Sequence, residues 1–176
     1  MVTVPAAVWR GGPVVRALTV GAAVGVFLGV LAWLDSGLLV AGVVVTVVVG
    51  GGYGIWMQRR MARFWPGAAA LTADERVAVA RAARRGEPVG SPGLAEALVE
   101  YGSGMRAAAE TARPYRWVIP LVLVVGVGMA VWDAFYGTWG NAVVSAIYLV
   151  LLLLEVFWWP RQQRRLLANA ERAAAA

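Results

Sequence analysis

Cysteine, histidine and lysine are absent from this sequence of 176 residues. The lack of cysteine excludes a disulfide framework, a thiol nucleophile and a thiolate metal site. The lack of histidine removes the commonest general base and metal ligand. No phosphate-binding glycine loop, catalytic triad order or metal-ligand spacing stands in their place. The sequence therefore predicts a protein that is not an enzyme and that holds no cofactor or metal.

Charged residues are also scarce, and long apolar runs dominate the chain. Charged residues make up 15% of the sequence, whereas 60% is hydrophobic and the mean hydropathy is +0.67, far outside the range of soluble domains. A helix needs about 20 mostly apolar residues to cross roughly 30 Å of hydrocarbon. Four segments come close to this length, namely 17–34, 38–57, 117–135 and 142–159.

The connections within each pair of apolar segments are only a few residues long, so each pair is expected to form an antiparallel hairpin. The predicted fold class is an all-α membrane protein with four transmembrane helices in two antiparallel hairpins and a short cytoplasmic helical hairpin between them. The predicted organisation is a cytoplasmic tail at 1–16, a hairpin at 17–57, a basic cytoplasmic loop at 58–116, a hairpin at 117–159 and a basic cytoplasmic tail at 160–176.

The distribution of basic residues predicts the orientation. All 16 are arginines: two precede the first span, ten lie between Arg59 and Arg116, and four follow the last span. Cytoplasmic loops of membrane proteins carry an excess of basic residues. Both termini and the central loop are therefore expected on the cytoplasmic side of a bacterial inner membrane. A cleaved signal peptide is the competing interpretation of the first span, but its apolar run is long for a signal core.

The central loop is predicted to contain two helices. Thr72 and Glu75 form a capping-box pattern that opens the first helix, which ends near Gly86. A segment rich in proline and glycine follows, and a second helix runs from Leu94 to about Ala112.

One apolar stripe on the second helix is a candidate docking surface. Its members are spaced four and three residues apart: Leu94, Leu98, Tyr101 and Met105. The loop is too small to form a core alone, and the first helix offers only Val77, Val79 and scattered alanines. We expect a partner outside the chain or the membrane surface to cover the stripe; the first helix is the alternative.

Small residues recur every four positions in the first two spans. These helix-packing candidates are Gly21, Gly25 and Gly29 in the first span and Gly42, Gly50 and Gly54 in the second. Ridges of small residues let helix backbones approach closely in lipid. They are expected to hold the chain's own helices together, and the alternative is an interface between copies of the chain.

Three carboxylates lie in or beside the spans. Glu155 is the single ionisable residue well inside an apolar run, and such residues are functional candidates by default. A structural ion pair with Arg59, Arg116 or Arg161 is the simpler interpretation, because Glu155 is only about one turn from the inner arginines. Asp35 and Asp133 are candidate outer-rim carboxylates.

Clusters of arginine next to the spans suggest contact with anionic lipid headgroups. The candidates are Arg59, Arg60, Arg63, Arg161, Arg164 and Arg165. Acidic residues interleave with the basic ones, which disfavours a nucleic-acid partner. The predicted function is a structural or accessory membrane subunit whose loop contacts anionic lipid or a partner protein. The alternative is a small oligomeric channel or transporter that uses Glu155, Asp35 and Asp133. A membrane enzyme acting on lipids is the least favoured.

Overall fold

A computed structural model describes residues 4–175, except for the side chains of Tyr115, Arg116, Ile119 and Glu155. This part of the chain is almost entirely helical and has no strand, so the all-helical prediction is confirmed. The elements in order are η1 (Ala6–Arg10), α1 (Pro13–Ser36), α2 (Leu39–Phe64), η2 (Pro66–Ala69), α3 (Ala73–Arg85), η3 (Pro92–Leu94), α4 (Ala95–Ala112), η4 (Arg113–Trp117), α5 (Val118–Tyr136), α6 (Trp139–Leu153), η5 (Leu154–Trp158) and α7 (Trp159–Ala175).

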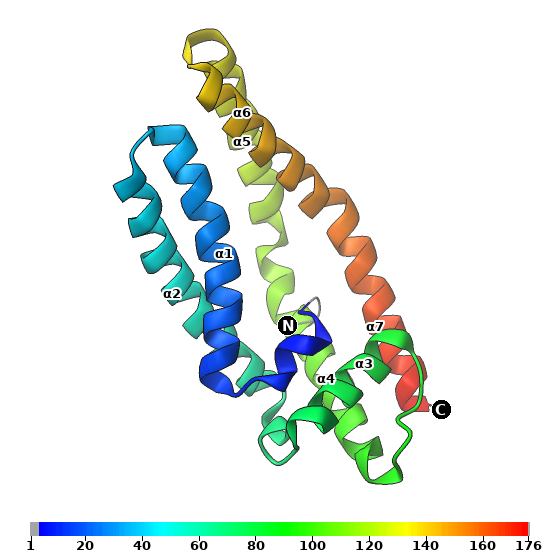
Figure 1. The fold of residues 1–176 in the computed structure, drawn as a ribbon. Helices are drawn as coiled ribbons and strands as arrows, with labels where there is room; N and C mark the ends of the chain where they lie inside the picture. The colour runs from blue at the N-terminus through cyan, green and yellow to red at the C-terminus, as the bar shows by residue number, and fades with distance from the viewer. Residues whose placement is uncertain (1–3, 176) are drawn as a thin grey trace.

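Helices α1 and α2 form a tight antiparallel hairpin (Figure 1). Gly37 ends α1 with φ 71°, a left-handed conformation that glycine adopts without steric cost, and its N–H bonds to the carbonyl of Trp33. The chain then reverses directly into α2.

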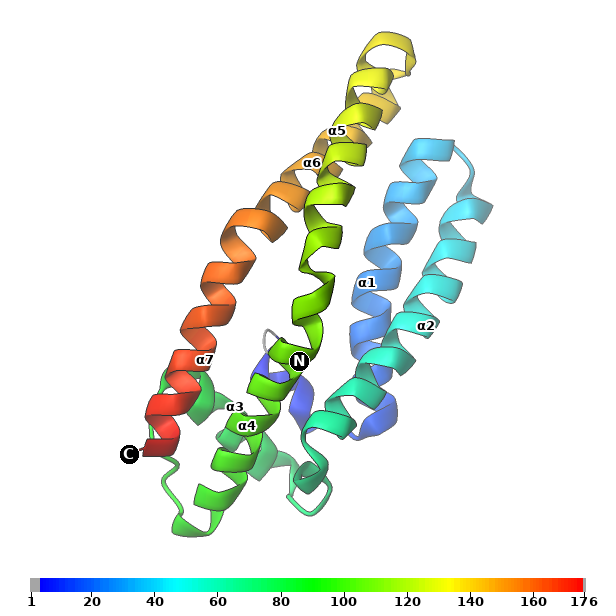
Figure 2. The same cartoon turned by 180° about the vertical axis from the view of Figure 1, so that it is seen from behind.

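The second hairpin is looser and ends in a very long helix. Ser145 of α6 donates a hydrogen bond to Asp133 of α5 near the connecting turn. Farther from the turn, α5 and α7 run apart (Figures 1 and 2). Helix α6, the π-helical turn η5 and α7 are continuous over 37 residues, Trp139–Ala175. The C-terminal segment predicted as a tail is therefore a helix.

Helix α2 also exceeds its predicted end at Met57 by two turns. It continues to Phe64 because Met57 and Met61 on its inner face are buried. It stops where Pro66 disfavours helical geometry at Trp65, whose φ of −146° is extended. The boundary predicted at residue 58 thus falls inside a helix.

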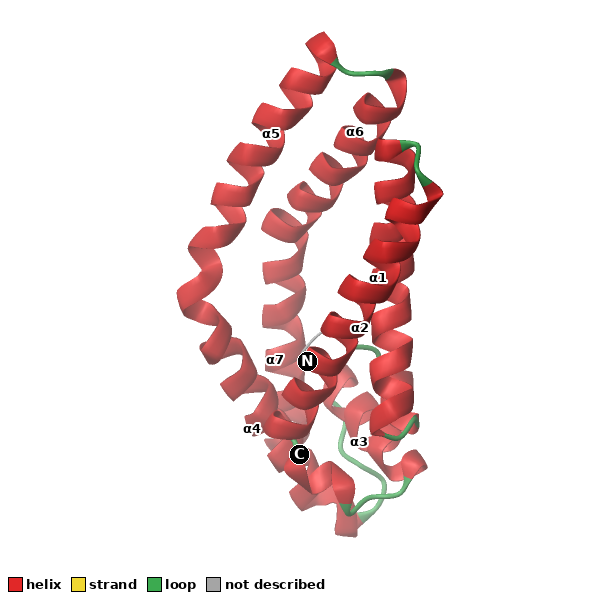
Figure 3. Cartoon of the chain, turned by 90° about the vertical axis from the view of Figure 1, so that its left-hand side faces the viewer, coloured by secondary structure: helices red, strands yellow, loops and turns green. Residues whose placement is uncertain are grey.

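The short elements gather at the end of the molecule opposite the two hairpin turns (Figures 1 and 3). We call this part the module; it comprises η1, the last two turns of α2, η2, α3, η3, α4 and the second half of α7. Its buried residues form one apolar core. Helix α3 lies at the centre and contacts η1, α4 and α7.

Among the described residues, three helices are long and apolar enough to cross a membrane: Pro13–Ser36, Leu39–Phe64 and Trp139–Ala175. Helix α5 is also apolar along its described part, Pro120–Tyr136.

Candidate functional site at the basic end of the bundle

Three aromatic side chains form the centre of the module. Trp9 comes from η1, Trp65 from the end of α2 and Tyr101 from α4, and all three are fully buried. Their ring centroids are 4.7 Å apart for Trp9 and Trp65, 4.6 Å for Trp65 and Tyr101, and 5.8 Å for Trp9 and Tyr101. All three pairs meet edge to face, the geometry that the ring quadrupole favours. The cluster therefore joins three distant parts of the sequence.

The polar atoms of this cluster lack hydrogen-bond partners. Within residues 4–175, no acceptor or donor meets the indole N–H of Trp9, the indole N–H of Trp65 or the hydroxyl of Tyr101. Burial raises the pKa of Tyr101 to about 12; nearby Arg84 and the Trp9 indole, which approaches without hydrogen-bond geometry, oppose the rise only in part. The phenol is therefore held neutral.

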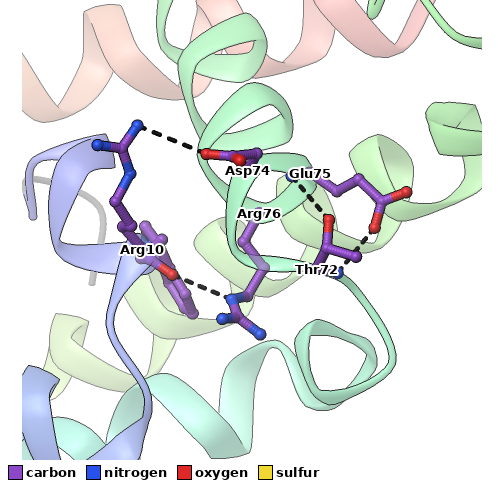
Figure 4. Close-up of polar contacts among 6 residues, drawn as sticks. Arg10, Thr72, Asp74, Glu75 and Arg76 are labelled. Carbon is purple, nitrogen blue, oxygen red and sulfur yellow. Dashed lines mark hydrogen bonds and ion pairs between the residues drawn. The ribbon is translucent and has the colours of Figure 1, made fainter.

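Arginine side chains join the module's segments through main-chain carbonyls. Arg76 of α3 donates from Nε to the carbonyl of Trp9 at 3.0 Å, as Figure 4 shows, and from Nη1 to Leu71 at 2.9 Å and Ala68 at 3.3 Å. A guanidinium group carries five N–H donors in a fixed fork, so one side chain can satisfy carbonyls on several segments. Arg76 thereby fixes η1 and η2 against α3.

Three other arginines act in the same way. Arg16 Nε donates to Gly11 at 3.0 Å, and its guanidinium lies 4.9 Å from the Trp9 ring centroid. Arg60 Nη2 donates to Ala108 of α4 at 2.8 Å, and Arg84 Nη1 donates to Val4 at 2.9 Å. These hydrogen bonds to main-chain carbonyls were not predicted from the sequence, where the arginines indicated topology, lipid contact and an ion pair with Glu155.

The start of α3 follows the predicted capping box, which is confirmed. Thr72 Oγ1 accepts from the Glu75 N–H at 3.4 Å, and the Glu75 carboxylate accepts from the Thr72 N–H at 2.7 Å (Figure 4). The hydrogen bonds from Thr72 lower the pKa of Glu75. The neighbouring Arg10–Asp74 ion pair, 3.5 Å apart, is exposed and contributes little. The helix ends at Gly86, as predicted.

The predicted docking stripe lies inside the chain's own core. Leu98, Tyr101 and Met105 are buried and Leu94 is half-buried against the same cluster. Residues from α2, α3 and α7 cover this face of α4. The expectation that an outside partner covers the stripe is therefore corrected. The scattered apolar residues of α3 are explained by its central position, because Val77, Val79 and three alanines are buried on several of its sides.

The glycine ridges face each other across α1 and α2. Gly21, Gly25 and Gly29 oppose a row on α2 that comprises Gly42, Thr46, Gly50 and Gly54. A Cβ added at Gly25 would lie 2.5 Å from the Thr46 carbonyl oxygen, and one added at Gly54 would lie 2.3 Å from the Ala17 carbonyl oxygen. These surfaces are buried within the chain.

The arginines proposed to contact lipid differ in exposure. Arg60 is half-buried, whereas the other five, Arg59, Arg63, Arg161, Arg164 and Arg165, are exposed. None of the six forms an ion pair with a described carboxylate. The exposed five are thus the ones placed to meet an external anion.

The three candidate carboxylates are not brought together as one described site. Asp133 accepts the hydrogen bond from Ser145, and Asp35 is exposed at the end of α1. The backbone of Glu155 belongs to the π-helical turn η5, and its side chain lies outside the described residues, as does that of Arg116. Among the described side chains, no group of three acidic residues could hold a metal ion.

Several residues that complete the core of the module were not predicted from the sequence to be buried. Trp9 and Trp65 flank short segments without helical periodicity, so no pattern marked them as core. Leu166, Ala170 and Ala173 of α7 are buried, and their spacing of four and three residues was a signal within the segment interpreted as a tail. Comparison with family models, with curated proteins and with solved structures finds no match.

Proposed function

We propose that this chain is a structural or accessory protein of the bacterial inner membrane, with four spanning helices and the module in the cytoplasm. Its exposed arginines contact anionic lipid headgroups beside the module. The observation that carries this proposal is the division of the surface into two zones.

Exposed apolar side chains are concentrated in one zone, on α1, α2, α5 and α6. In the module the pattern is reversed: between Met57 and Ala112, Val99 is the only exposed large hydrophobic among the described side chains. Soluble surfaces rarely carry apolar patches as extensive as the first zone. A bilayer around the hairpins and water around the module account for both zones.

The dimensions support this arrangement. A helix of 37 residues is about 55 Å long, whereas the hydrocarbon core is roughly 30 Å thick. Trp139–Ala175 is thus long enough to cross the bilayer and still extend into the module. The contacts of α3 with η1, α4 and α7 gather both tails and the central loop at one end of the molecule, which supports placing them together on the side that the arginines indicate.

Cysteine labelling tests the topology directly, because the sequence contains no cysteine to give background. Single cysteines at Ser36 and Asn141 should react with a membrane-impermeant thiol reagent in intact cells. A cysteine at Ser91 should react only after lysis. Labelling of the Ser91 variant in intact cells would overturn the orientation.

A lipid-binding measurement tests the proposed contact between the exposed arginines and anionic lipid headgroups. Replacing Arg59, Arg63, Arg164 and Arg165 together by Gln should lower the purified protein's preference for anionic over zwitterionic lipid. Each arginine near an anionic surface contributes about 1 kcal/mol to the binding free energy. The matched control replaces Arg81 and Arg85, exposed on α3, by Gln. An equal loss in both variants would contradict a localised lipid contact.

A further inference from the structure

A cavity lies between the first hairpin and the module. It has a volume of about 950 Å³, within the size range of sites for ligands of drug or lipid size. Residues of α1 and α2 form one wall, and residues of η1, the end of α4 and the start of α7 form the other. The lining includes Val8, Val20, Ala23, Trp56, Arg60 and Trp159.

The lining is apolar apart from one cation and a few neutral polar groups. No carboxylate lines the cavity among the described residues, and Arg60 is its single charge. Arg60 is fixed by its hydrogen bond to Ala108 and by the Trp56 ring, whose centroid lies 5.5 Å from the guanidinium carbon. The hydrogen bond to Ala108 leaves several guanidinium N–H groups of Arg60 able to reach an anion. A half-buried cation beside an apolar space is suited to an amphipathic anion.

The position of the cavity relative to the bilayer identifies the kind of ligand. Val20 and Ala23 belong to the apolar part of α1, whereas Val8 belongs to the module. Trp56 and Trp159 lie where aromatic side chains mark the interface between hydrocarbon and water. The apolar wall thus lies at the depth of acyl chains and Arg60 at the depth of headgroups, given the membrane insertion of the proposed function.

We propose that this cavity binds one anionic phospholipid, with an acyl chain along Val20 and Ala23 and the phosphate at Arg60. The bound lipid fills the space between the hairpin and the module. The site differs from the surface contact of the proposed function because it holds one molecule by its tail as well as its charge.

A matched pair of substitutions tests the tail contact. Ala23 lines the cavity, and its neighbour Ala22 is equally exposed but does not line it. The full chain, delipidated in detergent, is titrated with phosphatidylglycerol and with phosphatidylcholine of the same acyl chains, and bound lipid is counted by native mass spectrometry. The wild type and Ala22→Trp should each bind one phosphatidylglycerol, and Ala23→Trp should bind at least about tenfold more weakly. Equal binding by the two tryptophan variants would overturn the proposal.

The charge contact has its own test. Arg60→Gln should weaken phosphatidylglycerol binding about fivefold and leave phosphatidylcholine unaffected, and Arg60→Lys should restore most of the preference. Glycerol phosphate without acyl chains should not compete; competition at equal concentration would show a site for free phosphate and overturn the lipid assignment. If Ala22→Trp and Ala23→Trp bind alike while the variant lacking four surface arginines loses lipid, this site fails and the proposed function stands. Labelling of the Ser91 cysteine variant in intact cells would instead contradict the proposed function itself.

Discussion

Tyr101 carries a hydroxyl that nothing in the described core satisfies. Burying a polar group without a partner costs about 1–3 kcal/mol. The ring itself stabilises the core, because it contacts both Trp9 and Trp65 edge to face. The contribution of Tyr101 to stability therefore comes from its ring and is reduced by its oxygen.

Tyr101→Phe should raise the free energy of unfolding in detergent by about 1 kcal/mol, because it removes the unsatisfied hydroxyl and keeps the ring. Tyr101→Ala should lower it by about 3–5 kcal/mol through the cavity it creates. Tyr136→Phe, at an exposed tyrosine, is the control. Thermal unfolding followed by tryptophan fluorescence measures all three, and a marked loss of stability in Tyr101→Phe would show that the hydroxyl has a partner.

The same residue gives a pH dependence with a defined sign. The pKa of Tyr101 is about 12 in the folded chain and about 10 when unfolded, so the unfolded state releases its proton first. The stabilising contribution is complete below pH 10 and is lost as the pH rises toward 12. The wild type should lose up to roughly 3 kcal/mol relative to Tyr101→Phe over this window. Parallel pH profiles for the two proteins would contradict the burial of the phenol.

Glu155 separates the accessory proposal from the transporter alternative. If the carboxylate is only paired with an arginine near water, Glu155→Gln should accumulate at wild-type levels and change stability by less than about 1 kcal/mol. Proteoliposomes of the wild type should dissipate a pH gradient no faster than empty liposomes. Dissipation by the wild type that Glu155→Gln abolishes would favour the transporter, and the π-helical turn at Leu154–Trp158 would then lie at its site.

Among the elements, the α1–α2 hairpin depends most directly on residue size. A Cβ at Gly25 would lie 2.5 Å from the Thr46 carbonyl oxygen and 2.8 Å from the Gly50 Cα, so the two backbones would have to separate. At Gly51, on the same helix pair, a Cβ would meet nothing within 4 Å. Alanine substitutions at Gly25 and Gly51 therefore separate the effect of close helix packing on stability from the effect of helix propensity.

Gly25→Ala should destabilise the protein by about 1–3 kcal/mol, the usual cost of overpacking. Gly51→Ala should be neutral or stabilising by up to about 1 kcal/mol, because alanine favours the helix. Unfolding in mixed detergent micelles compares the pair. If both variants behave alike, the interface between α1 and α2 is less close than described.

The helix positions that could be predicted from sequence have local signals. Thr72 and Glu75 mark the start of α3, and Gly86 marks its end, since each supplies a cap. The ends of α2 and α7 were not predicted because hydropathy detects an apolar run and not the polar part of the helix that continues beyond it. Met61 and Leu166 lie on such continuations, among arginines that lower the mean hydropathy.

The candidate site could be predicted only in part, for a related reason. The stripe on α4 was visible from its spacing, yet what covers it depends on long-range contacts. Asn169 of α7 donates to the Arg84 carbonyl at 2.6 Å, and the Gly67 N–H donates to Glu100 at 3.0 Å. No periodicity encodes such contacts between distant segments. A partner outside the chain was predicted because the α7 residues that cover the α4 stripe lie in the segment 160–176, which was interpreted as a tail.

The molecule as a whole consists of two hairpins closed at one end by a module that η1, the central loop and α7 build together. Trp9→Ala should loosen the module, because it removes the ring that joins η1 to α2 and α4. We expect a loss of about 3–5 kcal/mol and faster trypsin cleavage at the arginines of α3 and α4. Trp139→Ala, at an exposed tryptophan beside the turn between α5 and α6, should leave the cleavage rate unchanged. Equal protease resistance of the Trp9 variant and the wild type would show that the module holds without its N-terminal segment.

The assembly of the module from η1, the central loop and α7 sets an order of events during synthesis. Helices α1 and α2 are neighbours in sequence, so the glycine-packed hairpin can form as soon as both helices have been made. The module cannot close until α7 has left the ribosome, since Leu166, Ala170 and Ala173 fill its core. Until then the apolar face of α4 is uncovered, and such exposed hydrophobic surface makes a partly folded chain prone to aggregation. Closure of the module thus depends on the arrival of α7.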